Sequence, residues 1–392
     1  MKVFFRRIHL YLAFAAGIVI MITCFTGAVL VFEEELQHLS HKERYYVQPG
    51  TARPIEELSA SLQQKVPGAT VTGIKIYTDK TRSAELYYSV KKKDDKKKDA
   101  PPTVKAQGSS VKPSQPGREN NRQVAYVNPY TAEIIELYNN KDSFFYSMLS
   151  LHRWLLGGDT GKLIVGICTL LFLFILITGI ILWWPKNRII LQQRLKIKWQ
   201  GGWKRLNHDL HIVTGFYSAI FLFIFAFTGL AWSFTWFNKG IYKVTNSSME
   251  QPKPPVNTFR ADVKTTTLDS IFAFAKTNIP DVKFYVITSP KDSLSPYSVS
   301  VLKDDAPHES AMDMYYINRY QPAILQSQQF SQRNLGQRVR STFKPVHTAS
   351  IWGWPSKIIG FIVCVLGVIF PITGYIMWWL RTSRKVRKTE PV

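Results

Sequence analysis

Four long apolar segments alternate with polar stretches along the chain. They span residues 9–32, 162–184, 211–235 and 357–380. A bilayer core about 30 Å thick is crossed by roughly 20 residues of α-helix, and each segment is long enough for this. The pattern predicts an integral membrane protein with four transmembrane helices.

Two hydrophilic blocks separate the first segment from the second and the third from the fourth. Each block repeats one order of patterns. A helical pattern, at 54–65 and again at 268–278, precedes three strands. The first two strands are expected around 71–77 and 84–90, and around 283–288 and 296–302; the third is expected to begin at Tyr126 in one block and at Tyr316 in the other. This order predicts an antiparallel sheet covered by a helix. The predicted fold class is therefore an α-helical integral membrane protein, a tandem duplication with two α+β domains outside the membrane.

These segments predict an order of domains. We expect a transmembrane helix at 1–32, a hydrophilic domain at 33–150 with a lysine-rich insert at 91–122, a histidine segment and second helix at 151–184, a basic loop at 185–210, a third helix at 211–235, a second hydrophilic domain at 236–346, a histidine segment and fourth helix at 347–380, and a basic tail at 381–392. The insert is rich in Lys, Pro, Ser and Gln, a composition that predicts disorder.

Positive charge is concentrated in short segments that flank the apolar helices. The chain has 50 Lys and Arg against 27 Asp and Glu, a formal net charge of +23. Much of this excess lies before the first helix, in the loop at 185–210 and in the tail at 381–392. Because Lys and Arg of short loops remain on the cytoplasmic side, we expect both termini in the cytoplasm and both hydrophilic domains exported. Contact with membrane lipid explains the charge, and no nucleic-acid partner is expected.

Two histidine patterns occur twice in the chain. His9 and His211 stand at equal distances before a Phe-Thr-Gly signature, and His152 and His347 at equal distances before an Ile-Thr-Gly signature. The signatures are Phe25-Thr26-Gly27, Ile177-Thr178-Gly179, Phe227-Thr228-Gly229 and Ile372-Thr373-Gly374. Parallel duplicated halves are related by an axis along the membrane normal. The two histidines of each pair are therefore expected to face each other at equal depth.

The paired histidines predict a metal centre. Ionisable side chains within a membrane are costly and usually functional. Two imidazoles on opposite faces of a porphyrin saturate its iron, and such a haem suits electron transfer. We expect His9 with His211, and His152 with His347, to ligate the iron of two b-type haems. The alternative is a structural role with hydrogen bonds to neighbours. The signature glycines are expected to let helices or a flat macrocycle approach closely.

Further polar residues near the predicted ligands are candidates for cofactor binding. His208 is a second candidate ligand in place of His211, or a partner of a haem propionate, and a hydrated interfacial position is its simpler role. Arg7, Arg153 and Arg205 flank the ligand positions and are candidate partners of the propionates through bidentate contacts. Anchoring at the membrane interface is the alternative for these arginines.

The remaining histidines and the cysteines are predicted to have no part in the chemistry. His38, His41 and His308 lie in charged, loop-like sequence without repeat partners, so we expect them at the surface. The three cysteines, all within apolar helices, are expected to be packing residues: Cys24, Cys168 and Cys364.

Nucleotide-binding signatures are missing from the sequence. Residues 157–162 are similar to a phosphate-binding loop but lack its first glycine, and Leu163 stands where that loop has Ser or Thr. No Gly-x-Gly-x-x-Gly follows a predicted strand. We therefore expect no nicotinamide site in this chain. We expect a separate electron donor instead, either a reductase or a quinone.

The four Thr-Gly signatures, the histidines at the helix ends and the repeated hydrophilic blocks together resemble the PepSY-associated transmembrane family. This family includes PiuB-like proteins and iron-uptake reductases of the FoxB type. The resemblance extends over nearly the whole chain. It implies PepSY-like exported domains, haem b and the reduction of ferric siderophores outside the bacterial inner membrane.

The leading hypothesis is a haem-dependent oxidoreductase, a di-haem reductase that passes electrons outward to a ferric siderophore or another ferric chelate. Reduction releases the iron because hard oxygen donors match the ferric ion better than the ferrous ion. One alternative is a non-enzymatic membrane protein whose PepSY-like domains bind a peptide, a protease or an uptake partner. Another is a permease for the siderophore, for which four helices with few buried acidic groups offer little sign of a transport path.

Overall fold

The computed structural model describes residues 1–90, 123–258 and 265–389. The predicted disordered insert at 91–122 lies outside these ranges. The chain divides into two compact units. The helical unit contains Met1–Glu33, Phe144–Ile241 and Val339–Val392, and the sheet unit contains Glu34–Ser143 and Tyr242–Arg338. Each unit is thus built from both halves of the duplication.

The helical unit confirms the prediction of four helices that are long and apolar enough to cross a membrane. They are α1 (Lys2–Leu30), α6 (Gly158–Trp183), α8 (Gly202–Ser233) and α12 (Trp354–Thr389). Each begins before its predicted apolar limit. Hydropathy marks only the apolar part of a helix, whereas the backbone hydrogen bonds continue into the polar flank. His9 and His211 therefore lie inside regular helix rather than at its first turn.

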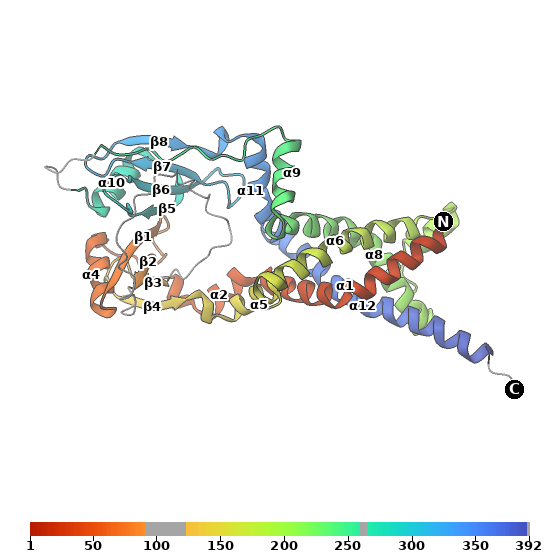
Figure 1. Ribbon diagram of the computed structural model, residues 1–392. Coiled ribbons are helices and arrows are strands. Elements are labelled where there is room, and N and C mark those ends of the chain that lie inside the picture. Colours follow the sequence, from red (N-terminus) through yellow and green to blue (C-terminus); the bar gives the residue numbers. More distant parts are fainter. Residues whose placement is uncertain (91–122, 259–264, 390–392) are drawn as a thin grey trace, which may run out of the picture. The chain divides into compact units, whose positions relative to one another are not determined.

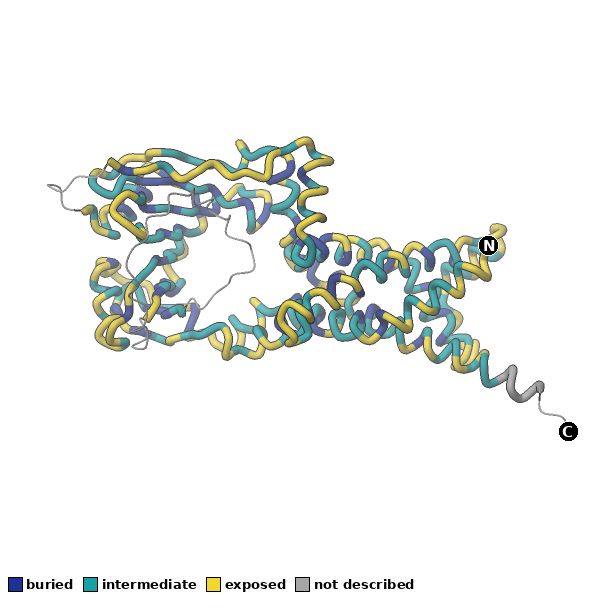
Figure 2. The backbone as a smooth tube through the Cα atoms, viewed as in Figure 1, coloured by how far each residue is buried: buried dark blue, intermediate teal, exposed yellow. Residues whose placement is uncertain are grey.

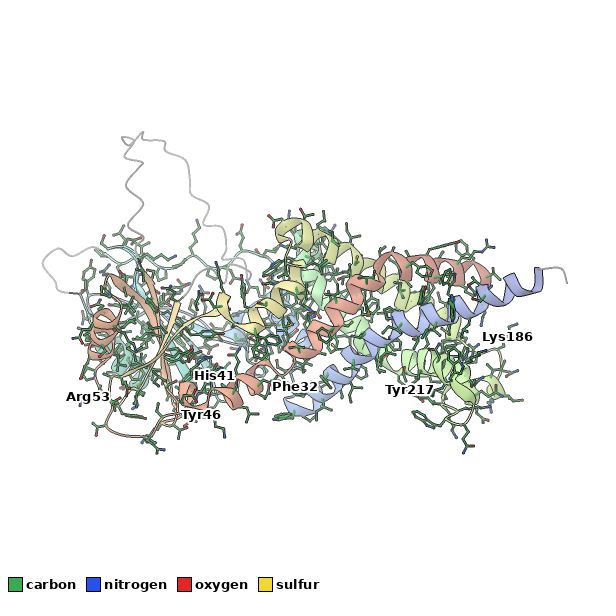
Figure 3. The ribbon with its side chains drawn as sticks, turned by 90° about the horizontal axis from the view of Figure 1, so that it is seen from below. Phe32, His41, Tyr46, Arg53, Lys186 and Tyr217 are labelled. Atoms are coloured by element: carbon green, nitrogen blue, oxygen red, sulfur yellow. The ribbon has the colours of Figure 1, made fainter. Side chains whose placement is uncertain are left out.

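The four long helices pack in a closed ring. Helices α1 and α8 each contact both α6 and α12, so α1 and α8 lie on one diagonal of the bundle and α6 and α12 on the other. Figure 1 shows the four helices running lengthwise beside one another. Exposed and partly buried positions alternate along these helices (Figure 2). Beyond the end of α1, the ring of Phe32 lies 5.7 Å from that of Trp354 and 5.6 Å from that of Phe361 (Figure 3).

The shorter helices α5 (Phe144–Trp154) and α7 (Arg188–Arg194) also belong to the helical unit. Of α9 (Thr235–Val244) and α11 (Leu335–His347), only the parts up to Ile241 and from Val339 onward belong to it. Helices α5 and α11 precede α6 and α12 and contain His152 and His347. Helix α5 packs against α1 and α6. In α11, Phe343 is buried in a cluster with Leu230 and Phe237. The second histidine of each half thus comes from a separate short helix packed onto the bundle.

The sheet unit contains one eight-stranded antiparallel sheet with the order β4-β3-β2-β1-β5-β6-β7-β8. Its strands are β1 (Ala69–Tyr77), β2 (Ala84–Val90), β3 (Gln123–Val127), β4 (Ile134–Asn139), β5 (Val282–Thr288), β6 (Tyr297–Lys303), β7 (Asp313–Ile317) and β8 (Ile324–Gln328). Its helices are α2 (Glu33–Ser40), α3 (Lys42–Tyr45), α4 (Ile55–Lys65) and α10 (Leu268–Asn278). The two predicted helices and six predicted strands are present. The third strand of each block, however, was expected to begin at Tyr126 and Tyr316 and instead ends at Val127 and Ile317, because the side chains of Asn128 and Asn318 accept hydrogen bonds that start a turn. Each block adds a fourth strand, β4 or β8, at a sheet edge, where little of the alternation that marks a strand is present.

The two hydrophilic blocks join through β1 and β5 into this continuous sheet. Gly73 pairs with Thr288 at the join, where a Cβ on Gly73 would stand 2.7 Å from the Ile287 carbonyl oxygen. Only glycine permits this approach. The Asp269 carboxylate of α10 also accepts a 2.8 Å hydrogen bond from the Ile55 amide of α4. The two blocks therefore form one folded unit, a relation that their separate sequence patterns do not predict.

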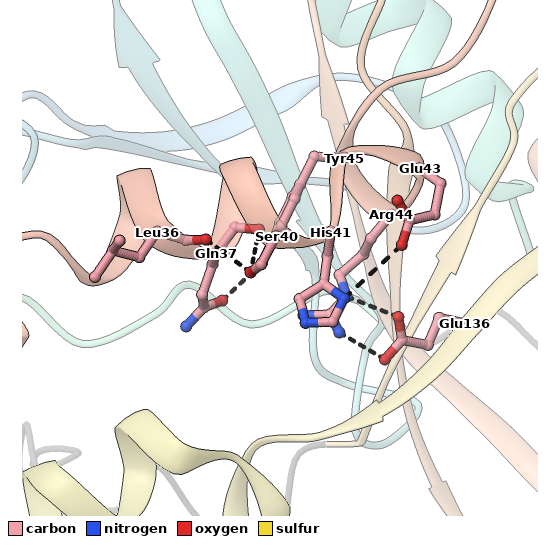
Figure 4. A network of polar contacts seen from close by, with 8 residues as sticks. All are labelled: Leu36, Gln37, Ser40, His41, Glu43, Arg44, Tyr45 and Glu136. Atoms are coloured by element: carbon pink, nitrogen blue, oxygen red, sulfur yellow. Dashed lines mark hydrogen bonds and ion pairs between the residues drawn. The ribbon is translucent and has the colours of Figure 1, made fainter.

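A buried ion pair fixes the chain that enters the sheet unit. Arg44, only 4 % exposed, donates two hydrogen bonds to Glu136 of β4, at 2.8 and 2.7 Å (Figure 4). The guanidinium also lies 4.6 Å from the ring centre of Tyr138. Bidentate pairing of this kind is directional and strong, so it holds α3 against the edge strand.

His308 differs from its prediction as a surface residue. It is 9 % exposed, and its ring lies edge-on to Phe330 with the ring centres 5.3 Å apart. Neither ring nitrogen has a hydrogen-bond partner. The charged sequence around it suggested exposure, but the loop folds so that the ring packs inward. His41, by contrast, keeps 47 % of its side chain exposed.

Candidate functional site

Each of the four paired histidines is held by the Thr-Gly signature of another helix. His9 of α1 contacts Thr178 of α6, and His211 of α8 contacts Thr373 of α12. The distances from imidazole Nδ1 to threonine Oγ1 are 3.0 Å for His9–Thr178, 2.9 Å for His211–Thr373, 3.1 Å for His152–Thr26 and 3.1 Å for His347–Thr228. The threonine of every signature therefore contacts the Nδ1 atom of one paired histidine. Each contact joins two residues of the same half of the duplication.

The glycine of each signature faces the same imidazole as its threonine. A Cβ on Gly229 would stand 3.1 Å from Cε1 of His347, closer than carbon atoms normally approach. The corresponding distances are 3.4 Å for Gly27 to His152, 3.4 Å for Gly179 to His9 and 3.3 Å for Gly374 to His211. The glycines thus admit a histidine ring against the helix backbone, where helix packing or a macrocycle was expected. We call each threonine and glycine with the ring they contact a Thr-Gly cradle.

Backbone carbonyls determine which ring nitrogen has the proton. Nδ1 of His152 lies 2.9 Å from the Thr23 oxygen, and Nδ1 of His347 lies 2.9 Å from the Phe225 oxygen. In the other two cradles, Nδ1 of His9 and Nδ1 of His211 contact threonine hydroxyls. Each hydroxyl already donates to a carbonyl of its own helix, so Nδ1–H donates to Oγ1 there. Because a carbonyl only accepts, Nδ1–H donates, which leaves a lone pair on Nε2. In the described part of the chain these four Nε2 atoms have no hydrogen-bond partner. Metal-ligating histidines show this arrangement.

The histidines of the two halves lie opposite each other. The ring centres of His9 and His211 are 6.4 Å apart, with an angle of 80° between the planes. Those of His152 and His347 are 6.0 Å apart, with an angle of 66°. A metal bound to one nitrogen of each imidazole at about 2 Å separates the ring centres by about 6 Å. The two pairs fit haem iron, which takes two axial ligands from the protein and four from its porphyrin. Among the described residues, no group of three or more His, Cys, Asp or Glu side chains is placed to hold a metal ion.

His9 and His211 also line a cavity of about 1250 Å³ inside the helical bundle. All four long helices contribute apolar side chains to its walls. A single drug-sized ligand occupies a pocket of about 300–1000 Å³, so the volume is sufficient for a macrocycle. The cationic residues that line it are Lys2, Arg6, Arg194, Lys204 and Arg381. His152 and His347 are not among its lining residues.

The structure separates the roles of His208 and His211. His208 lines the cavity, but its Nδ1 donates a 3.2 Å hydrogen bond to the buried carboxylate of Asp209. Arg205 donates to the same carboxylate at 2.9 Å. Only His211 lies in a Thr-Gly cradle and faces His9. His211 therefore fits the ligand position, while His208 and Arg205 form a polar network around Asp209.

The other candidate arginines differ in their position relative to the cavity and the paired histidines. Arg7 is exposed and is not among the cavity-lining residues, whereas its neighbour Arg6 is. Sequence reasoning missed Arg6, although its repeat position equals that of His208. The Arg153 guanidinium lies 5.3 Å from the ring centre of Trp154, next to His152 in the chain. Arg6 therefore shares the cavity with His9 and His211, and Arg153 follows His152 directly in the chain.

The sequence of the whole chain was compared with protein families and with curated proteins. No curated protein matches the chain. The family model described as the PepSY-associated TM region matches residues 6–381. This match includes all four long helices, the sheet unit and every cradle. The chain therefore belongs to the PepSY-associated TM family.

Proposed function

We propose that this protein is a di-haem membrane reductase that passes electrons to a ferric siderophore or another ferric chelate. The observation that supports this most directly is the set of four identical Thr-Gly cradles. They leave Nε2 available on four histidines, which are paired at 6.4 and 6.0 Å between ring centres. The duplication relates His9 to His211 and His152 to His347, but it does not relate one pair to the other, and both pairs share these features.

The two pairs divide the cofactor ligands between them. His9 and His211 hold one haem b, and His152 and His347 hold the other. A haem held by two histidines would supply one-electron transfer. The threonine and carbonyl contacts of the cradles keep the proton on Nδ1 and orient each ring. Arg6 and Arg153 are the proposed partners of the propionates, one at each pair.

The chain's charges support an outward direction of electron flow. Lys and Arg cluster at the end of the bundle that contains both termini and the loop between α6 and α8. Because the positive-inside rule assigns such an end to the cytoplasm, the proposal has the His9–His211 pair on the cytoplasmic side and the sheet unit exported. The proposed location is the inner membrane of a bacterium. In this proposal the sheet unit positions the ferric complex, whose reduction loosens its hard oxygen donors.

An optical spectrum with a haem count tests the assignment. Detergent-purified protein is expected to contain about two b-type haems per chain, with the sharp bands of a low-spin, six-coordinate iron. Replacing His152 and His347 together with alanine should remove one haem and leave the other. His41→Ala, at an exposed histidine (Figure 3), is the matched control and should retain both. Unchanged haem content in the double variant would refute the ligand assignment, and protein without haem would favour a binding role for the sheet unit.

A further inference from the structure

The interface between α6 and α8 has a repeat equivalent, the interface between α12 and α1, and we call each of them a seam. The two seams differ in how their aromatic rings pack. In the seam between α6 and α8, the rings of Trp183 and Phe216 stack flat, with centres 3.7 Å apart and an angle of 7°. The equivalent residues between α12 and α1 are Trp378 and Phe14, whose ring centres are 5.2 Å apart at an angle of 83°. One seam is thus closed by a flat stack, and the other is not.

Two sequence differences between the halves explain the unstacked seam. Pro371 of α12 stands where α6 has Leu176. A proline inside a helix removes one backbone hydrogen bond and bends the axis, and α12 diverges from α1 toward its C-terminal end (Figure 1). Tyr375 stands where α6 has Ile180, and its ring packs 5.6 Å from that of Trp378. The Tyr375 ring also lies 6.4 Å from that of Phe14, so it contacts both rings of this seam.

The cavity reaches the lipid-facing surface at this seam. Ile18 of α1 lines the cavity and is 69 % exposed, and Phe14, Ile372 and Tyr375 likewise both line it and are exposed. Ile220, the repeat equivalent of Ile18, is 60 % exposed but does not line the cavity. A ligand dissolved in the bilayer therefore has an apolar entrance between α1 and α12.

We propose that this cavity binds an isoprenoid quinone from the membrane, which enters between α1 and α12. The entrance has an aromatic rim, formed by Phe14, Tyr375 and Trp378, that suits a flat ring with an apolar tail. Inside the cavity, the indole N–H of Trp183 is buried without a hydrogen-bond partner. Quinone carbonyl oxygens accept such a bond, whereas the hydrocarbon tail of a lipid has no acceptor.

The volume and the polar residues also suit a ring-bearing lipid. At about 1250 Å³, the cavity exceeds the pocket of about 300–1000 Å³ that one drug-sized ligand fills, so a second ring has room beside a haem. His208, with its ring oriented by Asp209, lines the same cavity. The bound lipid therefore meets both an apolar wall and a group that exchanges protons.

The role of this quinone as an electron donor rests on the proposed function. Oxidation of one quinol to the quinone releases two electrons and two protons. A haem held by His9 and His211 would accept these electrons singly. It would pass each one on toward the ferric substrate before taking the next, so two turnovers would complete the oxidation of one quinol. The protons pass to His208 and from there to water at the basic end of the bundle.

The test uses the full-length holoprotein in nanodiscs of phosphatidylethanolamine and phosphatidylglycerol. Ile18→Trp fills the entrance, and Ile220→Trp makes the same change at the equivalent exposed position outside the cavity. Azido-decylubiquinone is photolysed with each protein, and the labelled peptides are identified. The rate of haem reduction by decylubiquinol is measured separately, with dithionite reduction as the control for haem content.

Label is expected in α1 and α12, and excess decylubiquinone should compete with it. Ile18→Trp should lower both labelling and the decylubiquinol rate about tenfold, equal to about 1.4 kcal/mol, while Ile220→Trp leaves both unchanged. Label that resists competition, or equal behaviour of the two variants, would overturn the inference and indicate adventitious lipid. If dithionite reduces the haem but decylubiquinol does not, the quinone inference is overturned while the proposed function remains intact. A protein without haem refutes the proposed function, and labelling still decides the binding site.

Discussion

Replacing Thr228 with valine tests whether the cradles serve metal binding. Valine keeps the shape of the side chain but removes the hydroxyl, which lies 3.1 Å from Nδ1 of His347. The Phe225 carbonyl, 2.9 Å from the same nitrogen, remains. Loss of a partner of a ligating histidine typically weakens metal binding about 10–100-fold. Because one of two partners is kept, we expect the lower end, about tenfold or about 1.4 kcal/mol.

The assay is haem transfer from the purified protein to excess apomyoglobin, followed optically. In Thr228→Val, about half of the haem should leave about ten times faster, because only the His152–His347 pair is affected. Thr169→Val is the matched control. The Thr169 hydroxyl donates to the Val165 carbonyl within α6, as the Thr228 hydroxyl does to the Ile224 carbonyl within α8, but no contact joins it to a histidine. Equal transfer rates in the two variants would show that the cradle threonine has no part in haem binding.

Two further predictions concern close packing and pH. Gly229→Ala should lower haem content more than Gly27→Ala, because its new methyl group would stand 3.1 Å rather than 3.4 Å from the histidine ring and overpacking costs about 1–3 kcal/mol. Pyridine haemochrome assays of the two variants measure their haem content. A lower haem content in Gly27→Ala than in Gly229→Ala would contradict the prediction. In the sheet unit, burial lowers the pKa of His308 below its ordinary value, so the unfolded chain takes up the proton first and the free energy of unfolding falls as pH drops through about 6.5. His308→Phe should reduce this loss in thermal unfolding curves at neutral and mildly acidic pH, while His41→Phe at an exposed position should not; identical pH dependence in the two variants would mean that His308 is not the responsible group.

The sequence by itself determined the features that depend on local pattern. A helix that must face lipid needs a long apolar run, so the four membrane helices were readable from hydropathy alone. The repeats at His9 and His211, and at His152 and His347, were equally visible, because a duplication conserves spacing whatever the fold. Six strands and the helices α4 and α10 were also predicted, since each has a clear alternating or helical period.

Only the tertiary structure decided which distant residues meet. The Thr-Gly signatures were evident, yet nothing local indicates that Thr228 serves His347, because that contact joins two different helices. The pairing of β1 with β5 depends on the close approach at Gly73, and the burial of His308 depends on how its loop folds. The difference between the two seams likewise arises from Pro371 and Tyr375 acting on side chains of a neighbouring helix. Sequence periodicity indicates which face of a segment is buried. Which other segment packs against that face is determined by tertiary packing.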